Sequence, residues 1–264
     1  LGHAPAINPH LRVVIASVLA LNLLAYVMQV AGLWSLWRSS MTPGVHAAGL
    51  LPNTAVWGAW CAISLPILWQ AWDDAWWTAG ALLITVVSLF LSHAHSSWIA
   101  VGLVSLAMLG WRLRWKMLSL VTLISLCGLD TQGRVFGWLL LRLNTWGIIL
   151  RCLYHHPLGL SWGPMTYQSV LKYAWGPMLP HAASDAMTLL LGLGWLAIPL
   201  LVWCGWQVWT RVELSPLWTS LVIAFVLGCI QTSVSLPAVG ALVWVIGCAY
   251  LMERVTVCSS ALPV

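Results

Sequence analysis

The sequence predicts an all-α membrane protein with about eight membrane-spanning helices. Three observations lead to this fold class. Of the 264 residues, 61% are hydrophobic and 6% are charged, which leaves too little polar surface to cover a soluble domain of this size. Apolar runs near the length needed to cross a hydrocarbon core of about 30 Å recur along the chain. Many of the 21 tryptophans stand beside polar or charged residues, as expected of side chains that anchor helix ends at the headgroup level.

The predicted membrane-spanning helices are the apolar runs, taken in chain order. They lie at residues 11–33, 47–69, 75–92, 97–111, 116–129, 187–209, 216–233 and 237–252. The fourth and fifth are short for a full crossing and are separated only by the sequence Trp-Arg-Leu-Arg-Trp-Lys, so we expect a tight hairpin with its ends inside the protein. No low-complexity linker or internal repeat divides the chain, and a single membrane domain over residues 1–264 is expected.

Basic residues orient these helices, because short loops rich in Lys and Arg stay on the cytoplasmic side of a membrane. The densest basic cluster and three further arginines are placed in the cytoplasm: Arg112, Arg114, Lys116, Arg12, Arg211 and Arg254. The same orientation sends the long segment 130–186 to the opposite side, which in a bacterium is the periplasm. The sequence therefore predicts a multi-pass protein of the bacterial inner membrane, with membrane lipid as one partner.

The periplasmic segment 130–186 is the one long interval that does not fit within a bilayer. It contains four of the eleven Lys and Arg residues and three of the eight histidines: Arg134, Arg142, Arg151, Lys172, His155, His156 and His181. Residues 135–153 are apolar apart from a few polar positions, which predicts a helix lying in the membrane interface.

Three arginines belong to this predicted interfacial helix. At 3.6 residues per turn, Arg134 and Arg142 lie within about 80° of each other, and Arg151 lies about 100° from Arg134 in the other direction around the helix. We therefore expect the three to face a common polar side of the helix. The alternative is that these arginines only reach towards lipid phosphates.

Two stretches that carry histidines follow the interfacial helix. His155 and His156 precede a turn that is dense in Gly and Pro. His181 lies just before an apolar helix near the membrane surface, where a neutral imidazole can accept a proton. Ser184 or Asp185 is expected to cap that helix.

The order of these motifs resembles the O-antigen ligase and O-antigen polymerase family, which also includes pilin-glycosylating oligosaccharyltransferases. That family shows a Gly-Arg opening a long periplasmic loop, a Trp shortly after it, a Pro-Leu-Gly-x-x-Gly-Pro turn, and a His before an apolar segment rich in Leu and Gly. The counterparts here are Gly133-Arg134, Trp138 or Trp146, Pro157-Leu158-Gly159 with Trp162-Gly163-Pro164, and His181 followed by residues 189–195. The resemblance runs from about residue 80 to residue 252.

The resemblance implies transfer of a glycan from a polyprenyl diphosphate to a sugar or protein hydroxyl on the periplasmic side. Arg134, assisted by Arg151 or Arg142, would stabilise the departing diphosphate, because guanidinium groups bind phosphate oxygens in bidentate fashion. His181 would be the general base for the acceptor hydroxyl. The other candidates for substrate binding are His155, His156 and Lys172. No nucleotide donor, metal ion or other cofactor is expected, since the lipid-linked glycan is the substrate.

An alternative from a different class is a non-catalytic integral membrane subunit or scaffold of a cell-envelope assembly. His95 and Ala182 motivate it, because they stand where the family usually has Arg and Asn. Nucleic-acid binding is disfavoured because the chain has no continuous basic face. Transport is disfavoured because no carboxylate falls within a predicted span. The seven cysteines form no CxxC pair and most fall within apolar segments, so we expect small buried hydrophobic side chains rather than a metal site.

Overall fold

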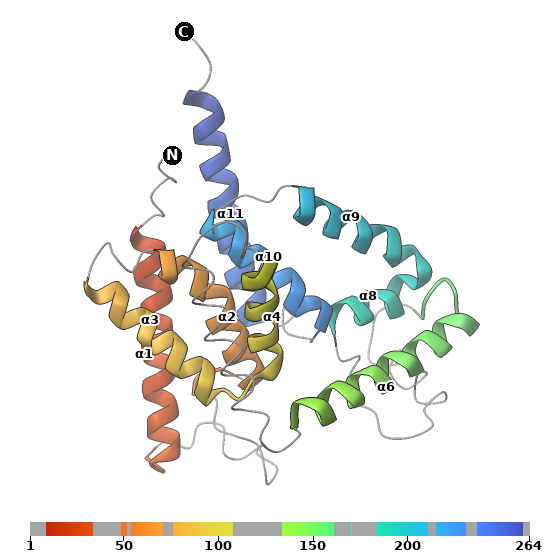
Figure 1. Cartoon of the computed structure of the whole chain (residues 1–264), viewed down its shortest axis with the longest axis horizontal. Helices are drawn as coiled ribbons and strands as arrows, with labels where there is room; N and C mark the ends of the chain where they lie inside the picture. The colour runs from red at the N-terminus through yellow and green to blue at the C-terminus, as the bar shows by residue number, and fades with distance from the viewer. Residues whose placement is uncertain are drawn as a thin grey trace. The chain divides into compact units, whose positions relative to one another are not determined.

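The described structure of the chain, a computed structural model, consists of helices joined by short turns (Figure 1). It describes residues 9–33, 49–51, 54–70, 76–107, 134–160, 170, 184–210, 215–230 and 237–260. No strand occurs among these residues, which confirms the all-α class.

The chain forms two compact units, each built from segments that are separated in the sequence. Unit 1 comprises Leu1–Val104, Glu213–Ala224 and Leu236–Val264. Unit 2 comprises Ser105–Val212 and Phe225–Ser235. The helix α10 (Pro216–Ile230) therefore contributes its first part to unit 1 and its end to unit 2. The single membrane domain expected from the sequence stays a prediction.

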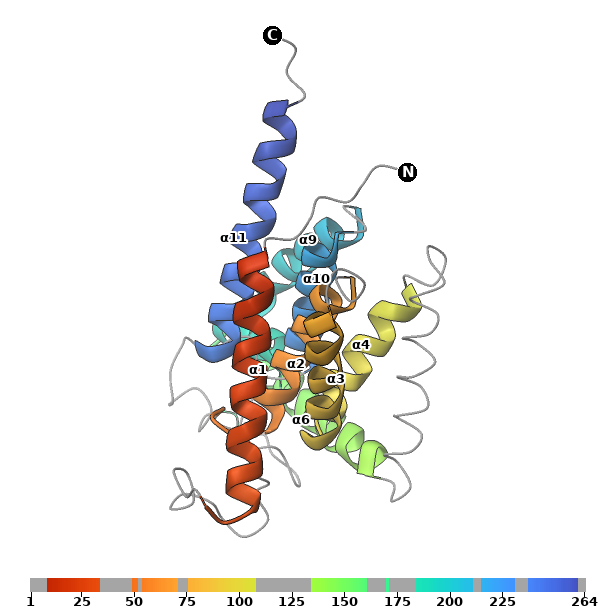
Figure 2. The same cartoon turned by 90° about the vertical axis from the view of Figure 1, so that its left-hand side faces the viewer.

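Unit 1 is built around the helix α2 (Thr54–Gln70). Its other helices are α1 (Pro9–Val30), α3 (Trp76–Leu91), α4 (His95–Ala107) and α11 (Pro237–Ser260). The helices α1, α2 and α3 lie side by side (Figure 2). Trp57, Ile63 and Leu68 of α2 are fully buried, as expected of a helix that is hydrophobic on all sides.

Two polar side chains of α1 hold the short segment 49–51 against this helix. The Asn22 side-chain oxygen accepts hydrogen bonds from the backbone N–H groups of Leu50 and Leu51, at 2.8 and 3.1 Å. The Gln29 amide donates to the carbonyl of Gly49 at 2.7 Å and accepts from the Gly49 N–H at 3.0 Å. Because Asn22 is buried, these bonds replace contacts with water that this part of α1 lacks.

A glycine allows α2 to approach the connection between α3 and α4 closely. A Cβ atom at Gly58 would overlap Ala94 and would lie 2.9 Å from the hydroxyl of Ser97. Small residues at such positions let helix backbones come together without a hydrophobic driving force, as in membrane helix packing.

Unit 2 consists of α6 (Arg134–His155), α8 (Asp185–Leu193), the 3₁₀ helix η2 (Gly194–Leu196), α9 (Ala197–Thr210) and the end of α10. Ser184 caps α8, and its hydroxyl accepts a hydrogen bond from the N–H of Met187 at 3.0 Å. This confirms the capping role expected for Ser184. At Gly194 the chain adopts φ 63°, and α9 folds back from α8 to form a V (Figure 1).

Helices occur where the sequence predicts apolar runs, with one important difference. The expected continuous helix 187–209 is divided into α8, η2 and α9, because Gly194 takes a left-handed conformation that an α-helix cannot continue through. The expected helix at 116–129 lies outside the described residues.

Two helical stretches of the described chain are long and apolar enough to cross a membrane, Pro9–Val30 and Asp185–Gln207. The second includes the bend at Gly194. The other apolar helices contain 10 to 17 residues. The expectation of about eight membrane crossings therefore stays a prediction.

Candidate functional site

The helix α6 carries most of the predicted site residues, and an apolar face fixes its position in unit 2. The face consists of Ile148, Ile149, Cys152 and Leu153, whose spacing repeats with the helical period. These side chains pack against other buried residues of unit 2: Val170, Leu190, Leu191 and Ala197. The C-terminal half of α6 is thereby held against α8, which fixes the side of the helix on which its described polar side chains lie.

Arg142 lies on the inward side of α6 and caps the end of α10. Its guanidinium is 7% exposed and donates a hydrogen bond to the carbonyl of Ile230, the last residue of α10. Carbonyls at a helix C-terminus lack partners within the helix and carry partial negative charge, so a cation stabilises them. Burial lowers the pKa of Arg142 to about 10, which still leaves it protonated at neutral pH.

The common polar face predicted for the arginines of α6 is wrong for Arg142 and Arg151. Arg142 is buried and Arg151 is exposed. They are nine residues apart, which at 100° per residue places them on opposite sides of a helix. One phosphate therefore cannot be bound by both side chains while α6 keeps this packing.

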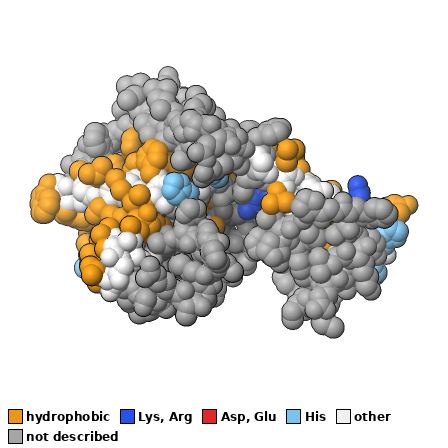
Figure 3. Space-filling model, turned by 90° about the horizontal axis from the view of Figure 1, so that it is seen from below, with side chains coloured by type: hydrophobic (Ala, Val, Ile, Leu, Met, Phe, Trp, Pro, Cys, Tyr) orange, Lys and Arg blue, Asp and Glu red, His pale blue; other side chains and the backbone are white. Residues whose placement is uncertain are grey.

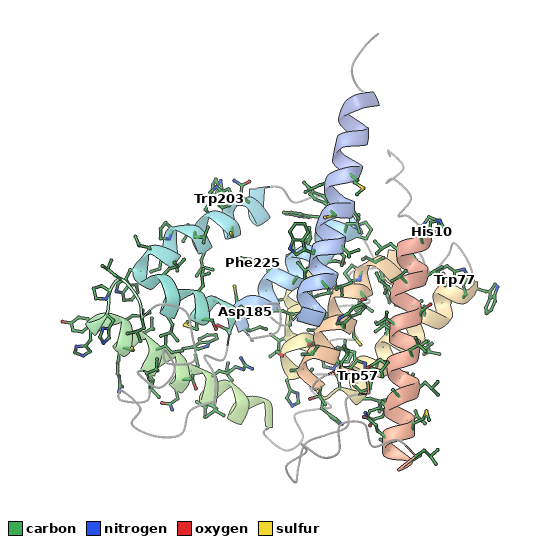
Figure 4. The ribbon with its side chains drawn as sticks, turned by 180° about the vertical axis from the view of Figure 1, so that it is seen from behind. His10, Trp57, Trp77, Asp185, Trp203 and Phe225 are labelled. Carbon is green, nitrogen blue, oxygen red and sulfur yellow. The ribbon has the colours of Figure 1, made fainter. Side chains whose placement is uncertain are left out.

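A second charged group of unit 2 lies near the end of α10. Asp185 begins α8 and interacts electrostatically with Cys229, the residue before Ile230 in α10. Figure 4 shows Asp185 at the start of α8 and Phe225 on α10, one turn before Cys229. The acid stands at a helix N-terminus and Arg142 at a helix C-terminus, the placement that helix dipoles favour. We therefore interpret Asp185 and Arg142 as charged groups that stabilise helix ends.

An exposed cluster forms the opposite, outward end of α6, and we call it the α6 tip. It comprises Arg151, Tyr154, His155 and Leu158, with Trp195 and Leu196 of η2. Tyr154 and Leu158 are 80% and 77% exposed. At this end of unit 2, Figure 3 shows a basic side chain near histidine and hydrophobic side chains. Cationic, aromatic and apolar groups thus share one outward-facing surface.

The turn after α6 is locked onto η2 by backbone contacts. The N–H of Trp195 donates to the carbonyl of Pro157 at 2.9 Å, and the N–H of Leu160 donates to the carbonyl of Leu191 at 2.7 Å. A Cβ atom at Gly159 would lie 2.6 Å from the backbone nitrogen of Gly194. The Gly and Pro turn therefore has a structural role that its composition alone did not reveal.

The remaining predicted site residues are described only in part. Arg134 begins α6, but its side chain lies outside the described atoms, and Lys172 and His181 belong to segments that are not described. The expected meeting of Arg134 and His181 stays a prediction. His155 is exposed and His156 is half-buried, immediately before the locked turn.

Sequence reasoning missed the contact between Arg142 and the end of α10. The signal that could have indicated it is the half-turn separation of Arg142 and Arg151. Because the two side chains lie on opposite sides of a helix, one of them faces the core when the other faces lipid or water. Within the described parts of the chain, no group of three or more His, Cys, Asp or Glu is placed to hold a metal ion. Comparison of the chain with protein-family models, curated proteins and solved structures finds no match.

Proposed function

We propose that this chain is a multi-pass protein of the bacterial inner membrane that transfers a glycan from a polyprenyl-diphosphate carrier to a sugar or protein acceptor in the periplasm. The observation that carries the proposal is the contact between two segments that are distant in sequence. The Pro157-Leu158-Gly159 turn lies against residues 192–195. Both segments belong to the motif order that resembles the O-antigen ligase and polymerase family.

Exposed apolar side chains support the membrane part of the proposal. Along α1, one side of a helix of 22 residues exposes Val13, Leu21, Leu24 and Val27. On α9, three neighbouring apolar side chains are exposed: Val202, Trp203 and Trp206. Figure 4 shows Trp203 pointing outward from α9. Water would meet a large apolar surface here, whereas lipid chains would cover it at no such cost.

The proposed chemistry uses Arg134 and His181. His181 takes the proton of the acceptor hydroxyl as the oxygen attacks the anomeric carbon, and the bond to the diphosphate oxygen breaks with its electron pair. Arg134 neutralises the charge that develops on the departing diphosphate. Lys172 and His156 remain candidates for binding the donor, whereas His155 belongs to the exposed α6 tip. Arg142 is assigned to packing, since its guanidinium already contacts the end of α10.

A transfer assay with the full chain in nanodiscs tests this function. The donor is a polyprenyl-diphosphate-linked glycan, and the acceptors are a lipid A core and a pilin-type protein. We expect Arg134→Ala and His181→Ala each to reduce transfer by a factor on the order of 100 or more. Gly137→Ala is the matched control on α6, because none of the described atoms lies within 4 Å of a Cβ at that position. Normal transfer by either site variant, with an unchanged melting temperature, would contradict the proposal.

A second candidate function is a non-catalytic subunit or scaffold of a cell-envelope assembly. The observation that favours it is the structural use of two motif elements, Arg142 as a helix cap and Gly159 as a packing contact. If this candidate is correct, purification in mild detergent recovers a stable complex with partner proteins. A purified monomer that transfers glycan would exclude it.

A further inference from the structure

We propose that the α6 tip docks into the headgroup layer of a bilayer leaflet and that Arg151 binds the phosphate of an anionic phospholipid there. The inference rests on the membrane location in the proposed function, but it is independent of glycan transfer. Its occupant is bulk membrane lipid and not the polyprenyl carrier.

The side chains of the tip have the chemistry that a headgroup layer selects. Tyr154 and Trp195 are aromatic groups with one polar atom, which prefer the boundary between hydrocarbon and water. Leu158 and Leu196 are exposed apolar groups on either side of the locked turn. Arg151 lies one turn before Tyr154 and His155 on the same outward side of α6. Its planar guanidinium matches two oxygens of one phosphate.

The charge around Arg151 favours an anionic partner from outside the protein. Among the side chains that the structure describes, Asp185 is the only acid, and it lies at the start of α8. The tip adjoins the other end of α8, where the turn after α6 bonds to Leu191 and Trp195. Arg151 is thus exposed at the end of unit 2 away from the described carboxylate. A positively charged and apolar surface of this kind binds anionic membranes.

The exposure of the tip distinguishes bulk lipid from an enclosed substrate. Binding sites for small molecules are concave and bury most of the ligand. Tyr154 and Leu158, by contrast, project with about four fifths of their surface free. Such projecting side chains enter a layer rather than surround a ligand. The turn is already held by its hydrogen bonds to α8 and η2. Docking therefore costs little conformational entropy.

Site-specific photo-cross-linking of the full chain tests the inference. Tyr154 is replaced by p-benzoylphenylalanine in nanodiscs of phosphatidylcholine and phosphatidylglycerol in equal amounts, and the adducts are identified by mass spectrometry. We expect lipid adducts in which phosphatidylglycerol exceeds phosphatidylcholine about fivefold, the preference expected of one basic residue near an anionic surface. Adding Arg151→Gln should bring the ratio close to one, whereas Arg151→Lys should keep most of the preference because it keeps the charge.

The control is p-benzoylphenylalanine at Trp244, an aromatic residue of α11 that is 75% exposed. We expect lipid adducts there without headgroup preference. If Trp244 and Tyr154 both capture no lipid, the membrane proposal itself fails. If Trp244 captures lipid and Tyr154 does not, or if Tyr154 captures both lipids equally, only the docking inference is overturned. If added polyprenyl diphosphate displaces the phosphatidylglycerol adducts, the tip binds the carrier, and the docking inference is overturned in this case too.

Discussion

Gly159 and Gly194 lie back to back, with the backbone of each filling the space where the other would carry a side chain. Both have positive φ, 84° and 63°. Gly159→Ala and Gly194→Ala should each lower the free energy of unfolding by about 2–4 kcal/mol, because a clash with rigid backbone adds to the strain of a left-handed conformation. Denaturation in mixed detergent micelles measures the change.

The matched control for this pair is Gly147→Ala in the interior of α6, where a Cβ would meet no atom of the described residues within 4 Å. This variant should raise the free energy of unfolding by about 0.5–1 kcal/mol, because Ala is favoured over Gly in a helix. Equal effects of the three substitutions would show that the contact between the two turns contributes nothing to stability.

Arg142 should contribute to stability through its contact with the end of α10. Arg142→Ala removes the hydrogen bond to the carbonyl of Ile230 and should cost about 1–3 kcal/mol. Arg142→Met should recover part of this loss, since it fills the space without the cost of burying a charge. Arg151→Ala on the exposed side should change the free energy by less than about 0.5 kcal/mol. A larger loss from Arg151→Ala than from Arg142→Ala would contradict the assignment of the two arginines.

Asn22 should stabilise unit 1 because its side-chain oxygen serves two backbone N–H groups. Asn22→Ala leaves both donors without this acceptor, and we expect a loss of about 1–3 kcal/mol. Ser17→Ala, at an exposed position of the same helix, is the control and should be nearly neutral. Hydrogen exchange at Leu50 and Leu51 provides a local measurement, and unchanged protection of these amides in the Asn22 variant would refute the role.

The close approach at Gly58 should tolerate no side chain. Gly58→Ala places a methyl group against Ala94, and α2 must shift from the connection between α3 and α4. We expect a loss of about 1–3 kcal/mol, as for other overpacked cores. Gly80→Ala in α3 meets no atom of the described part of the chain within 4 Å and should be neutral or slightly stabilising. A melting temperature that is equal in the two variants would contradict this packing.

Within the described residues, the apolar runs of the sequence predicted where helices form, and a local rule predicted the cap at Ser184. The break at Gly194 could not be predicted in this way, because hydropathy carries no information on the contact that Gly194 makes with Gly159, 35 residues earlier in the chain. Hydropathy reports which residues avoid water, whereas the direction of the chain depends on such distant contacts. The burial of Arg142 has the same origin, since its partner is the far end of α10.

The bend at Gly194 also changes the number of times that the proposed membrane protein crosses the bilayer. The arms α8 and α9 have 9 and 14 residues and extend about 14 and 21 Å, so neither alone covers a hydrocarbon core of about 30 Å. In the membrane proposed for this chain, with the α6 tip in the headgroup layer, the V therefore lies along the periplasmic interface, and both of its ends lie on the periplasmic side. A cysteine at position 211 should react with an impermeant maleimide from the same side of the membrane as a cysteine at position 130. Reaction from the same side as a cysteine at position 112 would show instead that residues 185–210 cross the membrane. Each segment after the V consequently runs in the direction opposite to the one that counting apolar runs would assign.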